Sequence, residues 1–305
     1  MDFSLLEKLC SIPGISGDEG AIRDFIVAYI QQESPSWDVQ PELIVGEELQ
    51  DGILLVFGSP TTAIFSHIDT VGYTAGYGVD LIKVGGPSAV SGTVLVGHDS
   101  KGPVTCKLHR SKEGALTYEC EREIERGTCL SYQPSFELNP TFVETPYLDN
   151  RLGVFVALNV AKNLQNGIIA FSCYEEVGGG NAEVLGRIVY EKYGVRQALI
   201  SDITWVTSGV QHCNGVAVSL RDSGIPRKKF TNRIQAVLNA KACKYQLEVE
   251  SAGGSDGNVL QKSPYPFDWC FIGAAEDNVH SPYERVAIVD IESMLEAYRC
   301  LMETL

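Results

Sequence analysis

The stretch GIIAFSCYEEVGGGNAEVLGRIVYEKYGVRQALISDI, residues 167–203, indicates the fold class. It contains an apolar run at 167–174, a helical pattern at 182–193 and a second apolar run at 198–203. Buried strands that alternate with helices of this length are typical of parallel strands joined by helical crossovers. The alternation continues through strand candidates at 216–220, 245–249 and 269–272 and helix candidates at 229–242 and from 290 onward. The pattern predicts an α/β fold with a mostly parallel sheet between two layers of helices.

A block of a different kind lies ahead of this stretch. Strand candidates at 52–57 and 63–67 come first. From 73 to 144, further short strand candidates alternate with glycine-rich turns, and no helical pattern separates them. We therefore expect one discontinuous domain formed by residues 1–72 and 145–305, interrupted by a small β-rich insertion domain at 73–144.

The composition excludes several classes of function. The formal net charge is -15 at pH 7, whereas nucleic-acid binding requires clustered Lys and Arg to meet the phosphate backbone. No basic leader precedes an apolar block at the N-terminus, and no apolar run approaches the length of a membrane span. The 9 cysteines include no CxxC pair, which argues against a disulfide framework and a zinc knuckle. We expect a cytoplasmic protein without nucleic-acid or membrane partners.

Polar side chains follow most of the predicted strands at the point where each strand ends. They are His67, Asp69, Glu175, Glu176, Asp202 and His280, and Asp149 stands directly before a helical pattern. Singly, each has an ordinary interpretation: Asp149 can cap a helix, the glutamates can be solvated, and His280 can lie at the surface. Together, the carboxylates would repel one another at the edge where parallel strands end. The sequence therefore predicts that cations bind there.

Two divalent cations balance these charges. Asp149, Glu176 and Asp202 supply three negative charges, two metal ions supply four positive ones, and a bridging hydroxide brings the sum near neutrality. Neutral imidazoles from His67 and His280 complete a mixed nitrogen and oxygen donor set. Such a set suits zinc above all, and also cobalt or manganese.

Two acids remain for other roles. Asp69 follows His67 by two residues in an extended chain, so both side chains point the same way and Asp69 can orient the far imidazole nitrogen. Adjacent residues at a strand end diverge, so Glu176 can bind metal while Glu175 faces the substrate. Glu175 is the predicted general base, because a metal ion lowers the pKa of its water from about 15.7 to about 7 and a carboxylate need only move the proton onward.

This combination resembles metallopeptidase family forty-two, the dinuclear-metal aminopeptidases that include glutamyl aminopeptidase and the tetrahedral aminopeptidases. The matching motifs occur in family order across nearly the whole chain: SIPGISGDE, SHIDTVG, YLDNR, YEEVGGG, SDIT, GGSDGN and VHSPYERV. The resemblance places the metal ligands on His67, Asp149, Glu176, Asp202 and His280. It also implies that Asp149 bridges the two metals, that Asp69 orients His67 and that Glu175 is the catalytic base.

The resemblance further implies a phosphorylase-like catalytic domain and a PDZ-like insertion that helps to build homo-oligomers. The chain departs from the family in two places. The insertion is short and has no KPPH-like segment, and LRDSGIP at 220–226 replaces a glycine-rich loop beside the substrate. Neither the twelve-subunit assembly nor a side-chain preference is therefore carried over.

The predicted function is removal of N-terminal residues from short peptides with a free N-terminus. Asp256, in GGSDGN, is a candidate for binding the substrate ammonium group, and a turn-forming aspartate is the alternative interpretation. Two other functions stay open. A related metal pair can serve a deacylase or carboxypeptidase that acts on N-acyl amino acids, and a relative without activity can serve as a binding or assembly subunit.

Overall fold

The computed structural model describes residues 1–305 and contains two separate sheets. The helices are α1 (Ser4–Ser11), α2 (Gly20–Glu33), α3 (Leu148–Ala161), α4 (Ala182–Tyr193), α5 (Lys228–Ala240), α6 (Asp256–Lys262) and α7 (Ile288–Thr304). The large sheet contains β1 (Glu42–Ile44), β2 (Ile53–Phe57), β3 (Thr62–His67), β10 (Glu137–Leu138), β11 (Phe142–Glu144), β12 (Gly167–Ser172), β13 (Gln197–Trp205), β14 (Val216–Arg221), β15 (Tyr245–Val249), β16 (Asp268–Asp277) and β17 (Arg285–Ala287). The small sheet contains β4 (Gly72–Ala75), β5 (Leu81–Val84), β6 (Val94–Asp99), β7 (Gly102–Arg110), β8 (Leu116–Glu119) and β9 (Cys129–Tyr132).

The large sheet is parallel at its centre and in the outer pair of β14 and β15, and its other pairings are antiparallel. Strand β3 lies between β12 and β13 and runs parallel to both, and β13 runs parallel to β16. Strands β1, β2, β17, β11 and β10 are joined to this centre by antiparallel pairing. The predicted α/β class is confirmed, with its parallel strands in the part of the sheet that carries the polar strand ends.

Alternate residues of strands in the large sheet face two different cores. Ile53, Leu55 and Phe57 of β2 pack into a large cluster with α1, α2, α3, α5 and α7. Leu54 and Val56 of the same strand face the opposite side, where α4 and α6 cover the sheet. Side chains alternate along a strand, so an uninterrupted apolar run can fill two cores only if helices cover both faces.

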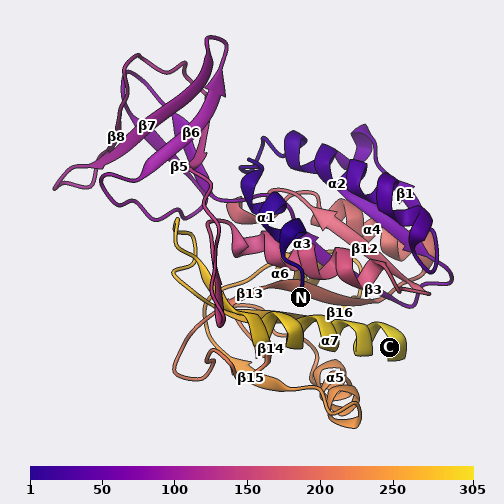
Figure 1. Ribbon diagram of the computed structural model, residues 1–305. Helices are drawn as coiled ribbons and strands as arrows, with labels where there is room; N and C mark the ends of the chain where they lie inside the picture. The colour runs from indigo at the N-terminus through magenta and orange to yellow at the C-terminus, as the bar shows by residue number, and fades with distance from the viewer.

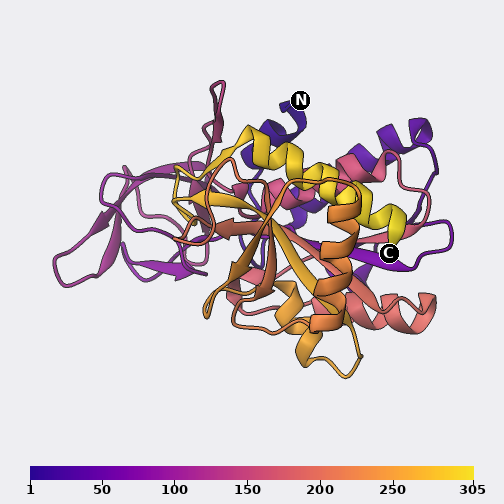
Figure 2. The ribbon, with the colours of Figure 1, turned by 90° about the horizontal axis from the view of Figure 1, so that it is seen from below.

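The small sheet stands apart from the large body, which carries both chain termini (Figures 1 and 2). All its neighbouring strands are antiparallel, and an isolated bridge between Asp80 and Thr117 brings its two edge strands together. The first part of the expected insertion, 73–144, therefore forms this barrel-like unit. Its last part contributes β10 and β11 to the large sheet through pairing with β17.

Several elements differ from their predicted extents, among them β16, which was predicted at 269–272 and continues to Asp277. Strand β13 continues to Trp205 because β16 pairs with it along its whole length. Asp256, for which a turn was the alternative interpretation, is the first residue of helix α6, whose N-terminus has a capping box between Ser255 and Asn258. None of the helices combines the length and apolar character needed to cross a bilayer.

Candidate metal centre

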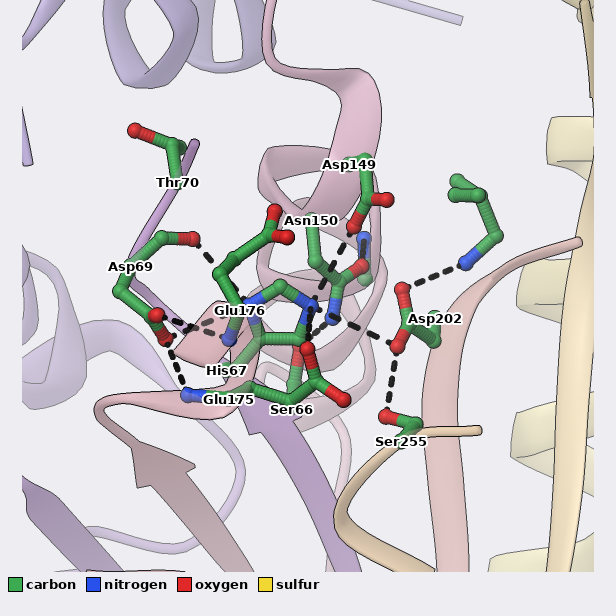
Figure 3. Close-up of polar contacts among 12 residues, drawn as sticks. Ser66, His67, Asp69, Thr70, Asp149, Asn150, Glu175, Glu176, Asp202 and Ser255 are labelled. Carbon is green, nitrogen blue, oxygen red and sulfur yellow. Dashed lines mark hydrogen bonds and ion pairs between the residues drawn. The ribbon is translucent and has the colours of Figure 1, made fainter. Parts of the chain in front are cut away.

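The central parallel strands bring distant residues to one place (Figure 3). Strand β3 ends at His67, and β12 leads into a short 3-10 helix, η3 (Glu175–Val177), that carries both glutamates. Asp202 lies within β13 and not at its end. Because the pairing between β3 and β13 stops at Phe65 and Ile200, Asp202 extends past its neighbour, and its Oδ2 lies 3.5 Å from His67 Nε2.

Asp149 stands between the two imidazoles. Its Oδ1 lies 3.3 Å from His67 Nε2, and its Oδ2 lies 3.2 Å from His280 Nε2. His280 Nε2 is also 3.1 Å from Glu176 Oε2. The five side chains thus form two groups that share one carboxylate: His67 and Asp202 on one side of Asp149, and His280 and Glu176 on the other.

The structure does not support helix capping as the role of Asp149. The start of α3 has no side-chain cap, and Asp149 and Asn150 have non-helical backbone angles. Asn150 instead accepts a hydrogen bond from Gly153 N–H at 3.0 Å and donates to Ser66 Oγ and to the Ser201 carbonyl. Asn150 thus ties the first turn of α3 to β3 and β13, which leaves the Asp149 carboxylate free to face the imidazoles.

Asp69 contacts His67 and also the segment that carries Glu175 and Glu176. Its side-chain Oδ1 lies 3.4 Å from His67 Nδ1, the nitrogen that faces away from Asp149. The same carboxylate accepts backbone hydrogen bonds from Glu175 at 3.0 Å and Glu176 at 3.1 Å, and a third hydrogen bond from Ser16 Oγ at 2.6 Å. Asp69 therefore joins the end of β3 to the segment that carries both glutamates.

The pKa shifts within the cluster indicate an excess of negative charge. Burial lowers the pKa of His280, but hydrogen bonds to Asp149 and Glu176 outweigh this effect and raise the pKa to about 11. Burial, with the nearby Asp149 charge, raises the pKa of Glu176 to about 7, and its buried Oε1 has no hydrogen-bond partner. The pKa of His67 is also well above its usual value, because the surrounding carboxylates outweigh its burial. The carboxylates thus stabilise the protonated form of both imidazoles.

The donor set fits divalent metal ions. One ligand atom each from His67, Asp149 and Glu176 lies within 4.8 Å of the others, so ligands of both groups lie close together around the shared Asp149 carboxylate. The orphaned Glu176 Oε1 and the excess of carboxylates are features that bound cations would explain. Imidazole nitrogen with carboxylate oxygen is a set typical of zinc, cobalt and manganese.

Glu175 occupies a different position from its neighbour. Its Oε2 is 4.0 Å from His67 Nε2, and its side chain retains 18% of its exposure, compared with 3% for Glu176. Burial is the main reason that the pKa of Glu175 lies well above its ordinary value, and the charges of Asp202 and Glu176 add to the effect. A carboxylate with a raised pKa at the edge of a cavity can accept and return a proton.

Sequence reasoning missed Glu284 and overestimated the exposure of Asp256. Glu284 is fully buried, and its two oxygens accept hydrogen bonds from the backbone N–H groups of Asp149 at 3.1 Å and His280 at 2.9 Å. The acid in VHSPYERV was the available signal. Asp256 is also fully buried, accepts a hydrogen bond from Ser172 Oγ, and does not line the cavity beside the cluster.

A cavity of about 560 Å³ opens beside the cluster. Asp149, Glu175, Glu176, Asp202 and His280 all lie on its wall. A small organic molecule or the end of a peptide therefore has direct access to the carboxylates and to one imidazole.

The family model described as M42 glutamyl aminopeptidase matches residues 110–296, which is more than half of the chain. This chain belongs to the M42 glutamyl aminopeptidase family. Membership makes it a metal-dependent hydrolase of peptide bonds that removes N-terminal residues, as predicted. Asp149, Glu176, Asp202 and His280 therefore line the cavity of a metallopeptidase.

Relatives of this M42 protein match over nearly their full length. A putative aminopeptidase from Acetivibrio thermocellus is 25% identical over 96% of this chain and 96% of its own. A lysyl aminopeptidase from Pyrococcus furiosus is 22% identical over 100% of this chain and 98% of its own. The solved TET1 peptidase of Pyrococcus horikoshii, described as assembling into a tetrahedron or a large octahedral shell, has a TM-score of 0.83 at 21% identity, with 99% of each chain covered. The last match shows that the fold is shared.

Proposed function

We propose that the protein is a dinuclear zinc aminopeptidase that acts on short peptides with a free N-terminus. The observation that carries this proposal is the position of Asp149, whose two oxygens face two different imidazoles. His67, Asp149 and Asp202 would hold one ion, and Asp149, Glu176 and His280 the other. When bound, the two ions supply Lewis acidity toward the scissile carbonyl and lower the pKa of water.

Glu175 is the proposed general base. Its side chain is on the cavity wall, does not belong to either ligand group, and has a raised pKa. It accepts the proton of the attacking water and returns it to the leaving amine, so the carboxylate is restored after each turnover. Asp69 keeps Glu175 in place through the hydrogen bond to its backbone N–H.

The decisive experiment changes the base without changing the ligands. Glu175→Gln should retain both metal ions by elemental analysis but lower kcat by about 10²- to 10⁴-fold, the usual contribution of a positioned general base. Glu176→Gln is the matched control, and it should lose metal. The substrates are an aminoacyl anilide and its N-acetylated counterpart, of which only the free amine should react. Wild-type turnover by Glu175→Gln would reject the assignment, and hydrolysis of the acetylated substrate alone would favour a deacylase.

The small sheet is proposed as an insertion domain that supports homo-oligomers. Four exposed apolar side chains lie in β5 and in the connections on either side of it: Tyr77, Val79, Ile82 and Val90. One solved relative in fold is described as a dodecamer, and another as a tetrahedral or octahedral assembly. Contact between copies would remove these apolar side chains from water.

The thiols support a cytoplasmic location, which we also propose. All nine cysteines are free, including Cys243 and Cys300, whose sulfur atoms lie 3.3 Å apart. Neighbouring thiols persist where the compartment is reducing.

A further inference from the structure

The cavity wall beyond the metal ligands is acidic. It carries Glu183 from α4, Asp222 from the turn after β14, Glu248 from β15 and Glu250 just after it. None of these four carboxylates belongs to an ion pair, and Lys262 is the only lysine or arginine on the wall. Metal ions held by Asp149 would offset the ligand carboxylates but would leave these four uncompensated.

Two of the four carboxylates are deeply buried and incompletely hydrogen-bonded. Glu248 is 4% exposed, and Thr204 Oγ1 donates a hydrogen bond to its Oε1, while its Oε2 has no partner. Asp222 is 5% exposed, and its Oδ1 accepts a hydrogen bond from Gly224 N–H at 2.5 Å, while its Oδ2 has none. Because both residues line the cavity, each presents a free acceptor to whatever binds there.

Strand β13 sets the distance from the metal ligands to this acidic wall. Asp202 and Thr204 are two residues apart on the strand, so they face the same side and their Cα atoms are roughly 7 Å apart. Thr204 contacts Glu248 directly. An extended lysine side chain places its ammonium group about 6 Å from its Cα. A substrate whose free amine lies beside Asp202 can therefore reach the Glu248 carboxylate with its side chain.

We propose that the cavity selects peptides whose N-terminal residue is lysine or arginine. This inference rests on the proposed aminopeptidase function. The aliphatic part of the substrate side chain packs against Phe271, which also lines the cavity. Its cationic end bonds to Glu248 and Asp222, while an N-terminal glutamate or aspartate is repelled by the same carboxylates.

Names in the family do not settle the preference. The family model is described as glutamyl aminopeptidase, and one relative is described as lysyl aminopeptidase. The choice must therefore come from this chain's own cavity, whose free acceptors are carboxylates that match a cation and oppose an anion.

The test compares lysyl and norleucyl anilides on the metal-loaded protein. Norleucine has nearly the same shape as lysine without the ammonium group, so the pair isolates the charge. We expect kcat/KM to be at least about tenfold higher for lysine, which corresponds to one hydrogen bond to a charged group. The glutamyl anilide should be the poorest substrate. Equal kcat/KM for lysine and norleucine, or a preference for glutamate, would overturn the proposal.

Variants then locate the preference. Glu248→Gln should reduce the lysine-to-norleucine ratio at least about tenfold. Glu292→Gln, which removes the same charge from an exposed position on α7, should leave the ratio unchanged. Asp222→Asn serves as a second variant if Glu248→Gln does not fold. An unchanged ratio in the folded cavity variants would exclude the acidic wall as the selector.

Calorimetry of free L-lysine against L-norleucine gives a readout that does not depend on turnover. Tighter binding of lysine to the wild type, lost in Glu248→Gln, supports the inference. If no anilide is hydrolysed, the proposed aminopeptidase function is wrong. If lysine and norleucine also bind equally, the proposed preference for a cationic side chain is wrong as well. Hydrolysis without a lysine preference would refute the inference and leave the aminopeptidase intact.

Discussion

Asp149 shows how a single carboxylate can serve two neighbouring ion sites. Its oxygens lie 3.3 Å and 3.2 Å from two imidazoles, and its backbone N–H is held by Glu284. Glu284 also holds the backbone N–H of His280, so one buried glutamate positions two of the proposed ligands. At the scale of residues, hydrogen bonds from the second layer thus determine where the ligands point.

Metal binding should release protons. Without metal, the Asp202 charge and hydrogen bonds to carboxylates raise the pKa of His67 well above its usual value, and hydrogen bonds to Asp149 and Glu176 raise the pKa of His280 to about 11, so metal ions compete with protons for both imidazoles. Metal ligation requires neutral imidazole. We expect at least about one proton released per ion bound, as measured by titration calorimetry in two buffers of different ionisation enthalpy. His280→Gln should release fewer. Binding of two ions with no proton release would contradict the proposed ligands.

Glu19 should make the protein less stable as the pH rises. It is fully buried ahead of α2, and burial raises its pKa from 4.5 to about 7. Below pH 4.5 both folded and unfolded states hold the proton; between 4.5 and 7 only the folded state does, so the free energy of unfolding falls as pH rises and levels off above 7.

Glu19→Gln should remove this decrease in the free energy of unfolding with pH. The free energy of unfolding of the variant minus that of the wild type should rise by roughly 2–3 kcal/mol from pH 5 to pH 8, as measured by urea unfolding of both proteins under matched conditions. A difference between the two proteins that does not change with pH would show that Glu19 ionises freely in the folded state.

At the scale of elements, the site depends on segments that are held together across the sheet. The carboxylate of Asp69 joins the end of β3 to η3. The small sheet contributes as well, because Tyr132 Oη of β9 and Ser88 N–H both donate hydrogen bonds to the His280 carbonyl, at 2.9 Å and 2.8 Å. The loop that carries His280 is therefore held from both the large and the small sheet.

Asp69→Asn should loosen η3 and weaken metal binding. In the wild type, two backbone N–H groups and the Ser16 hydroxyl donate hydrogen bonds to the two carboxylate oxygens of Asp69. An asparagine has only one acceptor oxygen in its side chain, so it cannot accept all of them. We expect metal affinity to fall about 10- to 100-fold, measured by competition with a chelator. Ser16→Ala, which removes one of the three hydrogen bonds, is the matched control and should have a smaller effect. Wild-type affinity in Asp69→Asn would contradict a positioning role.

At the scale of the whole molecule, the small-sheet unit carries exposed apolar side chains that do not line the cavity beside the cluster. Ile82 is 58% exposed and Val90 62% exposed, and both belong to the unit that stands apart in Figures 1 and 2. An edge strand with apolar side chains is a favourable surface for pairing between copies. The assembly should therefore form through this sheet.

Ile82→Asp should reduce the molecular mass of the assembly in light scattering while the chain stays folded. Burying a new charge between copies is costly unless it is paired. Val45→Asp is the control, because Val45 is 42% exposed on the large body, and it should leave the mass unchanged. If Ile82→Asp has the same mass as the wild type, the contact between copies lies elsewhere.

The sequence by itself determined the α/β class and the candidate ligands. Uninterrupted apolar runs such as 167–172 can be buried only between two layers of helices, and polar residues at the ends of parallel strands meet at one edge. His67, Asp149, Glu176, Asp202 and His280 could be selected in this way because each lies next to a periodic element that is visible in the chain.

Tertiary structure alone decided which atoms meet. Glu284 binds the Asp149 backbone 135 residues away, Asn150 and not Asp149 accepts the Gly153 N–H hydrogen bond, and Asp256 is buried outside the cavity. The acidic wall around Glu248 arises only where α4, β13 and β15 converge on one cavity. Periodicity reports which face of an element is buried, whereas hydrogen bonds and shared cavities depend on distances between segments that have no fixed separation along the chain.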